Sequence, residues 1–314
     1  MNDFTLRQVE YFLAVLDHGS VSAAAKACRV SQATVSAALG QLEKRLGVTL
    51  LARGPARSAR PTSEGREFAF HARAILATVT EAVESIGDVA TLQGNLRIGC
   101  IPTAAPRIFP GVAAAFSREY PALDISFHEA APVECQRRVL DGEIDIAVMY
   151  LRQLQFAGLQ KHELMAVQSH AVIAADHPLA GQAELDLRAL RNDSFILLDS
   201  PPTADLVVAQ MRTLGLEPQV RWLIPDAETI RSMVAMGLGV SIANAVPHPT
   251  TRSFHGLPVN YVPLINPEVS NTIIAVTRAE TRMSKKLTTA LSTLRATAEE
   301  TNPLGWHAGH QVQP

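Results

Sequence analysis

Cysteine is scarce in this sequence, which has only Cys28, Cys100 and Cys135 among its 314 residues. Their spacing fits neither a disulfide framework nor a zinc site. No apolar run is long enough to span a bilayer, and the opening residues MNDFTLRQVE lack the basic-then-apolar pattern of a signal peptide. These absences predict a cytoplasmic chain without disulfides, metal sites or a membrane partner.

The chain as a whole has no large excess of positive or negative charge, since its formal net charge is only -2. Along the sequence, however, the charges are unevenly distributed. Residues 1–60 hold eight Lys and Arg against four Asp and Glu, a net charge of +4. A basic segment in a weakly acidic chain is typical of nucleic-acid binding, because phosphate contacts need cations. The length and the hydrophobic content of 47% predict two or three domains with well-filled cores.

A helix, a tight turn and a second helix are predicted within residues 20–47, after a first helix over 5–18. Ser31 is the expected N-cap of the second helix, because its hydroxyl can accept from the free N–H groups there. Such a cap places short polar side chains where a helix N-terminus contacts base edges in the major groove. The polar side chains on this outer face are Gln32, Thr34, Ser36 and Gln41. The alternative is a pair of surface helices in an ordinary domain.

The segment 53–60, RGPARSAR, contains Gly54 and Pro55 and therefore cannot continue a helix. It predicts a short β-wing or turn. Arg53 and Arg57 are expected to contact phosphates or to enter the minor groove. The alternative is an exposed loop whose arginines are merely solvated.

The run GSVSAAAKACRVSQATVSAALGQLEKRLGVTLLAR, residues 19–53, resembles the winged helix-turn-helix of LysR-type transcriptional regulators, and the likeness continues into PTSEG. Ala37 and Ala38 depart from it where many members carry longer polar or basic residues, and Leu51 replaces a common Phe. The resemblance implies a DNA-binding domain over residues 1–61. The positions that carry the resemblance are Ser20, Ala24, Ala25, Ser31, Gln32, Val35, Ser36, Leu42, Glu43, Leu46, Gly47, Leu50 and Arg53.

Residues 62–92 follow as a long helical pattern whose apolar positions alternate in steps of four and three, which predicts a coiled-coil seam. In the resembled family this linker makes the dimer, so we expect a homodimer and, from two dimers, a homotetramer. The alternative is that the stripe packs against the chain's own body. The apolar positions are Phe68, Ala72, Ile75, Val79, Ala82, Ile86 and Val89.

Strands and helices alternate over residues 93–300, which predicts an α/β fold with a parallel sheet and helices on both faces. The segments 142–148 and 228–243 resemble the family's two-lobed, periplasmic-binding-protein-like effector domain. We expect lobe I to comprise 93–163 and 267–300. Lobe II is expected over 164–266, beginning with the strand ELMAVQ, and a disordered tail over 301–314.

An effector is expected beyond the carboxyl ends of the strands of this domain. Thr103 is the leading candidate, because it can cap the following helix and donate to an anion, with the N–H of Ala104 and Ala105 pointing the same way. Family members often use Ser or Thr here for an effector carboxylate. The alternative is that Thr103 is only a helix cap. The weaker candidates on other strand ends are Ala131, Tyr150, Ser200 and Thr203.

Tyr150 stands after the third strand where some carboxylate-binding relatives carry Arg, so this pocket is expected to be too weakly cationic for a dicarboxylate. A small amphipathic or aromatic acid, or a neutral metabolite, fits the residues better. No cofactor is expected besides such an effector.

Sequence-specific regulation of transcription under control of this effector is the function that the resemblance implies. Its partners would be double-stranded promoter DNA, further copies of the chain and, for an activator, the transcription machinery. An enzyme is disfavoured, because no nucleophile, base and orienting residue form a catalytic set and the histidines lack ligand spacing. A cytosolic binding protein without a DNA role does not explain the basic segment. A peroxide-sensing member of the family would need two partnered cysteines in lobe II, and no cysteine follows Cys135.

Overall fold

The computed structural model describes residues 4–53, 59–86, 92–244, 252–279 and 283–300. The predicted Arg57 and the tail 301–314 lie outside these ranges. The chain divides into two compact units. One, here called the winged-helix unit, comprises Met1–Gln93 with Leu140–Glu143, and the other, the α/β unit, comprises Gly94–Val139 and Ile144–Pro314.

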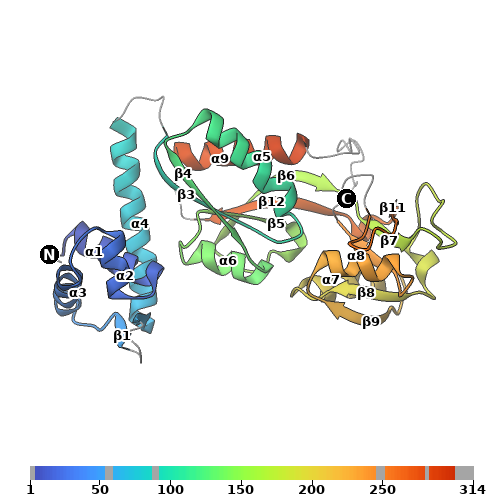
Figure 1. The fold of residues 1–314 in the computed structure, drawn as a ribbon, viewed down its shortest axis with the longest axis horizontal. Helices are drawn as coiled ribbons and strands as arrows, with labels where there is room; N and C mark the ends of the chain where they lie inside the picture. The colour runs from blue at the N-terminus through green and yellow to red at the C-terminus, as the bar shows by residue number, and fades with distance from the viewer. Residues whose placement is uncertain (1–3, 54–58, 87–91, 245–251, 280–282, 301–314) are drawn as a thin grey trace. The chain divides into compact units, whose positions relative to one another are not determined.

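Three short helices form the core of the winged-helix unit (Figure 1). They are α1 Leu6–His18, α2 Val21–Ala27 and α3 Gln32–Leu46. The side chains of Thr5, Ser20 and Ser31 cap them by accepting from Gln8, Ala23 and Thr34 backbone N–H groups, respectively. Left-handed Gly19 ends α1 and Gly47 ends α3. The predicted helix-turn-helix is therefore confirmed. Its buried core includes Val9, Phe12, Ala24, Val35, Leu39 and Leu42.

An antiparallel wing follows, made of β1 Leu51–Arg53 and β2 Ala59–Pro61. Glu43 of α3 holds its start, because one carboxylate oxygen accepts from the N–H of Leu50 at 2.7 Å and of Leu51 at 3.1 Å. The start of the wing is thereby anchored to α3 by hydrogen bonds from its backbone to the Glu43 side chain, and not by side-chain packing alone.

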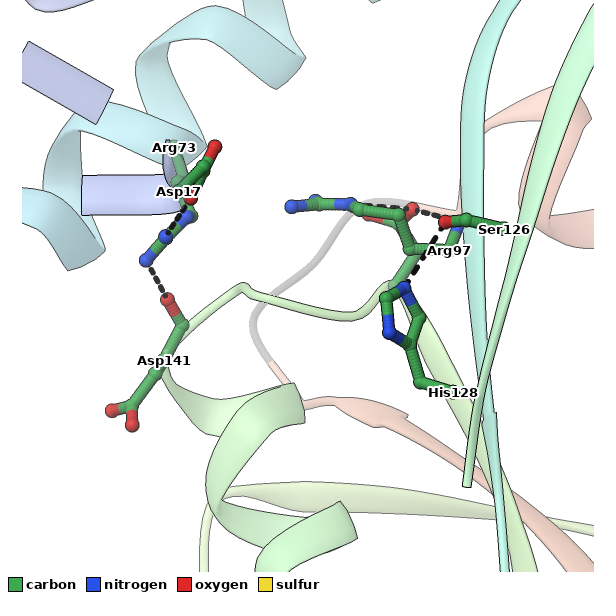
Figure 2. A network of polar contacts seen from close by, with 7 residues as sticks. Asp17, Arg73, Arg97, Ser126, His128 and Asp141 are labelled. Carbon is green, nitrogen blue, oxygen red and sulfur yellow. Dashed lines mark hydrogen bonds and ion pairs between the residues drawn. The ribbon is translucent and has the colours of Figure 1, made fainter. Parts of the chain in front are cut away.

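The linker helix α4 spans Ser63–Ile86, and the first part of its apolar stripe packs within its own unit. Ala72 is fully buried there, and the Phe68 ring lies 5.3 Å from that of Phe12. Arg73 adds an ion pair to Asp17 at 2.9 Å (Figure 2). Val79, by contrast, is 36% exposed. The seam prediction was thus wrong for Phe68 and Ala72, because α1 already covers that face, and it stays a prediction from Val79 onward.

Five strands form the larger sheet of the α/β unit in the order β4-β3-β5-β12-β6. Strands β4, β3 and β5 are parallel, whereas β12 runs antiparallel to both β5 and β6. Helices α5 and α9 cover one face and α6 the other (Figure 1). The elements are β3 Gly94–Cys100, α5 Ala105–Glu119, β4 Leu123–Glu129, α6 Pro132–Leu140, β5 Ile146–Tyr150, β6 Leu159–Val167, β12 Asn271–Arg278 and α9 Lys285–Glu300.

This sheet corrects the prediction that ELMAVQ, residues 163–168, opens lobe II. Its first five residues end β6, which pairs with β12 from Leu159 to Val167. Arg97 of β3 forms an ion pair with Asp145, just before β5, at 2.8 Å. Ser126 and His128 of β4 lie 3.1 Å apart at their side-chain ends (Figure 2). Because β12 runs antiparallel to β5 and β6, lobe I has a mixed sheet and not a wholly parallel one.

Lobe II is built on a three-stranded sheet of order β10-β7-β11 and on the parallel pair β8-β9. A bridge between Phe195 and Val240 joins the two. The chain passes between the lobes near residues 167–170 and again near 263–271. The elements of lobe II are β7 His170–Ala174, η3 Leu187–Leu190, β8 Ser194–Leu198, α7 Thr203–Thr213, β9 Gln219–Ile224, α8 Ala227–Ala235, β10 Ser241–Ala243, β11 Val259–Pro263 and η4 Pro267–Val269. The short η2 Leu151–Gln153 follows β5 in lobe I.

Candidate functional site

The outer face of α3 carries the predicted base-reading residues, and Ser31, Gln32, Thr34 and Ser36 are all exposed. Ser31 also caps the helix, since its hydroxyl accepts from the Thr34 N–H at 3.0 Å and lies 2.8 Å from the Thr34 hydroxyl. The side-chain amide oxygen of Gln32 accepts from the Ser22 hydroxyl at 3.0 Å, which leaves the side-chain N–H groups of Gln32 as donors. This end of α3 therefore presents short polar groups fixed by the cap.

Basic residues also occur on α3 and on the elements next to it in the chain. Lys26 and Arg29, at the end of α2, and Lys44, in the last turn of α3, are exposed. Arg53 ends β1 and Arg60 lies exposed in β2. Such side chains attract the phosphates on either side of a groove.

A cleft of about 910 Å³ lies between the two lobes of the α/β unit. Of the predicted ligand residues, Thr103, Tyr150 and Thr203 line it. Ala104, Ala131 and Ser200 are not among the residues that line it, and their assignment stays a prediction. Ala104 is 1% exposed, packed into the lobe I core, whereas Ala131 is exposed elsewhere.

The start of α5 also differs from the prediction. The N-cap is Ala104, which has no capping side chain, so Thr103 does not cap the helix. The N–H groups of Ala104 and Ala105 both donate to the Ile101 carbonyl at 3.0 Å. They are therefore not available to an anion, and recognition at this end of the cleft falls to side chains.

Tyr150 is the most deeply buried of these side chains, with 4% of its surface exposed. Burial raises the pKa of its hydroxyl to about 12, although the neighbouring Arg107 charge and a hydrogen bond with Thr103 oppose this. The phenol consequently stays protonated near neutral pH and offers a neutral hydrogen-bond donor to the cleft.

Arg107 was missed by the sequence reasoning. It lies in the first turn of α5 and lines the cleft beside Thr103 and Tyr150. Burial lowers the pKa of the guanidinium, and Tyr150 partly opposes the shift. The only available signal was its place in the first turn of the helix that follows a strand end, because ligands bind at such places.

Gln153 was also missed, although it joins the two lobes. Its amide nitrogen donates to the Thr203 hydroxyl of α7 at 3.0 Å, and its amide oxygen accepts from the Tyr150 N–H at 3.1 Å. Its backbone carbonyl accepts from the fully buried Gln136 of α6 at 2.9 Å. A chain of hydrogen bonds therefore runs from the lobe I core through the cleft to lobe II.

Both units match known families. Residues 6–66 match the model described as bacterial regulatory helix-turn-helix protein, lysR family, and residues 90–299 match the LysR substrate binding domain. The chain belongs to the LysR family. It is a DNA-binding transcriptional regulator with an effector-binding domain, not an enzyme, and its partners are double-stranded DNA and further copies of itself.

Relatives match this LysR-family regulator over most of its length. A hydrogen peroxide-inducible genes activator of Pectobacterium carotovorum subsp. carotovorum is 30% identical over 275 residues, 87% of this chain and 90% of that one. HinK, a LysR family transcriptional regulator from Pseudomonas aeruginosa, is 30% identical with a TM-score of 0.62, and the match covers 94% and 99% of the two chains. A full-length OxyR variant from Pseudomonas aeruginosa has a TM-score of 0.75 at 24% identity, covering 94% and 97%, and supports the fold.

Within the described residues, no helix is long and apolar enough to cross a membrane. The same part of the chain contains no group of three His, Cys, Asp or Glu side chains placed to hold a metal ion.

The cysteines lead to a prediction about peroxide. Cys100 and Cys135 are fully buried, and burial raises the pKa of the Cys100 thiol well above its ordinary value and that of Cys135 to about 11. Peroxide reacts with the thiolate, which is scarce in such thiols near neutral pH. We expect DNA affinity, measured by fluorescence anisotropy, to change less than about twofold after peroxide treatment of the reduced regulator. A peroxide-induced disulfide seen by mass spectrometry, together with altered affinity, would contradict this expectation.

Proposed function

We propose that this regulator changes its DNA binding when a small organic acid occupies the cleft between the lobes. The observation that supports the acid is the cationic Arg107 beside the neutral hydroxyls of Thr103 and Tyr150 at one end of the cleft. A ligand that contacts both lobes stabilises the closed arrangement by its differential affinity for it, which shifts the population of the DNA-bound states. Thr103, Tyr150 and Thr203, with Arg107 and Gln153 added, are the proposed effector contacts.

On the DNA side, the proposed base-reading residues are Ser31, Gln32, Thr34 and Ser36, and the proposed phosphate contacts are Arg53 and Arg57. The polar, exposed face at the start of α3 supports this assignment. A regulator of this kind acts where its promoter is, so we assign it to the cytoplasm.

Self-association is proposed through α4 from Val79 onward, because Val79 and Ala82 remain exposed beyond the part of the stripe that α1 covers. Two such dimers would form the tetramer. The domain limits proposed are 1–61, 62–92 and 93–300, with lobe I over 93–163 and 267–300 and lobe II over 164–266, except that β6 extends lobe I to Val167.

Alanine at Gln32 is expected to weaken binding to the specific operator about tenfold or more, because a good base contact discriminates by about 1–3 kcal/mol. Binding to unrelated DNA should change little, since phosphate contacts dominate it. The measurement is fluorescence anisotropy with DNA flanking the regulator's own gene at two salt concentrations, with unrelated DNA as competitor. Ser292→Ala, at an exposed position of α9, is the matched control. An equal loss on both kinds of DNA would argue against base reading by Gln32.

The effector role is tested in the same assay by adding candidate organic acids. A shift of the DNA-binding curve that Thr203→Val removes supports the proposal, because Thr203 lines the cleft from lobe II. A shift that the substitution does not alter would place the effector elsewhere, and no shift with any acid would leave the α/β unit without the proposed control.

A further inference from the structure

The charges inside the cleft are unequally satisfied. Arg152 donates through Nε to the Ser270 carbonyl at 2.9 Å. Arg231 pairs with Glu228 and hydrogen-bonds to Tyr261. Within the described part of the chain, no Asp or Glu pairs with Arg107, which is half-buried in the first turn of α5. A half-buried guanidinium without a counter-ion costs free energy that a bound anion would recover.

The lobe II wall opposite carries two acidic side chains beside Arg231, whose Nε is buried without a hydrogen-bond partner among the described residues. Asp226 and Glu228 lie on it. Asp226 caps α8 by accepting from the Thr229 N–H at 2.7 Å, and Glu228 accepts from the Phe254 N–H at 3.0 Å besides pairing with Arg231. Both carboxyl groups line the cleft. A second carboxylate on a ligand would therefore approach acidic side chains on this wall, and Arg231 there already pairs with one of them.

Much of the remaining surface of the cleft on the side of lobe II is aliphatic, with the polar side chains of Gln210, Ser241 and Asn244 among it. It comprises side chains from β7, β8, α7, α8 and β10, which pack on the lobe II cores. The aliphatic residues on this wall are Val172, Leu198, Leu206, Val207, Ile230 and Ile242. Burying an uncharged hydrocarbon body there is favourable in proportion to the area removed from water.

We propose that the cleft selects a monocarboxylate, whose single carboxylate binds Arg107 with the hydroxyls of Thr103 and Tyr150, and whose apolar body lies on the lobe II wall. This inference rests on the proposed function and narrows its ligand. Tyr150 stays neutral, so it donates to the carboxylate without repelling it. Nearby His170 is buried, its pKa is lowered by burial and by the Arg107 charge, and it therefore adds no second cation.

The test is calorimetry on the full-length protein with two matched series of probes. One is hexanoate, adipate and hexanamide, and the other is phenylacetate, 1,4-phenylenediacetate and phenylacetamide. In at least one series the monocarboxylate should bind about tenfold more tightly than both the dicarboxylate and the neutral amide, as expected for a charge-assisted hydrogen bond at a partly desolvated site. Dicarboxylates that bind equally well or better, or no preference in either series, would overturn the proposal.

Arg107→Met should remove the preference for the monocarboxylate over the amide, whereas Arg107→Lys should retain part of it, because a lysine keeps the charge but not the bidentate geometry. Arg152→Met is the matched control, since it removes a cation from the same cleft that already has a backbone partner. Circular dichroism shows whether each variant is folded. A preference that persists in folded Arg107→Met would overturn the assignment.

The same probes in the DNA anisotropy assay separate the two proposals. A monocarboxylate that binds through Arg107 yet leaves DNA binding unchanged contradicts the effector role and leaves the binding site intact. A dicarboxylate or neutral amide that shifts DNA binding through the cleft, without help from Arg107, contradicts the monocarboxylate site and leaves the effector role intact.

Discussion

Gly65→Ala is expected to destabilise the winged-helix unit by about 3 kcal/mol, at the upper end of the overpacking range. A Cβ added at Gly65 would lie 2.0 Å from the Leu50 carbonyl oxygen and 3.0 Å from its carbonyl carbon, both backbone atoms that cannot rotate away. That oxygen already accepts from the Thr62 N–H at 3.0 Å, and the Thr62 hydroxyl accepts from the Gly65 N–H at 2.9 Å. The substitution must therefore separate the start of the wing from the start of α4.

Gly65→Ala should also lower the affinity for specific DNA about tenfold or more, because the same Leu50 segment holds the wing and α3 in register. Thermal unfolding followed by circular dichroism and operator binding by anisotropy measure the two effects. Gly40→Ala is the matched control: a Cβ there meets nothing within 4 Å, and alanine is expected to stabilise α3 by about 0.5–1 kcal/mol. If Gly65→Ala were as stable as the wild type, the contact between Leu50 and the start of α4 would have relaxed at no cost, which would contradict the expectation.

Gln136→Met is expected to destabilise the α/β unit by about 2–4 kcal/mol, because an unpaired buried polar group costs about 1–3 kcal/mol. The Gln136 side chain is fully buried in α6. Its amide nitrogen donates to the Pro132 and Gln153 carbonyls at 3.0 and 2.9 Å. Its oxygen accepts from the Gln155 and Phe156 N–H groups at 2.8 and 3.0 Å. Methionine keeps the volume and removes all four hydrogen bonds.

Because Gln153 bonds both Gln136 and Thr203, the same variant should also weaken ligand binding in the cleft. Urea unfolding gives the free energy of unfolding, and calorimetry with the tightest acid probe gives the affinity. Gln160→Met, exposed on β6, changes the same chemical groups without burial and should be nearly neutral. Equal unfolding midpoints for the two variants would contradict the role assigned to Gln136.

Local patterns explain why the winged-helix unit could be predicted closely. Thr5 and Ser31 cap helices through neighbours three residues away, so their signals lie within the segment itself. The linker helix was predicted for the same reason, but not the burial of Ala72, since the repeat of an apolar stripe does not show which surface covers it. In this chain α1 covers the first part of it.

The position of the cleft was predicted from the sequence, but only some of the residues that line it were. Thr103 and Tyr150 lie at strand ends, and that rule located them. Ala104 and Ala131 follow the same rule, yet one is packed into the core and the other lies outside the cleft. Arg107 and Gln153 gain their roles from neighbours on other elements, which no local pattern shows.

The sequence by itself determined the family, the order of the elements, the helix caps and the concentration of positive charge near the N-terminus. These depend on spacings of a few residues and on composition. Only the tertiary structure decided that β6 belongs to lobe I, because its partner β12 lies more than a hundred residues later in the chain. It also decided that Arg107 faces the cleft beside Tyr150, because pairing between distant segments, and not local periodicity, sets which side chains share a buried surface.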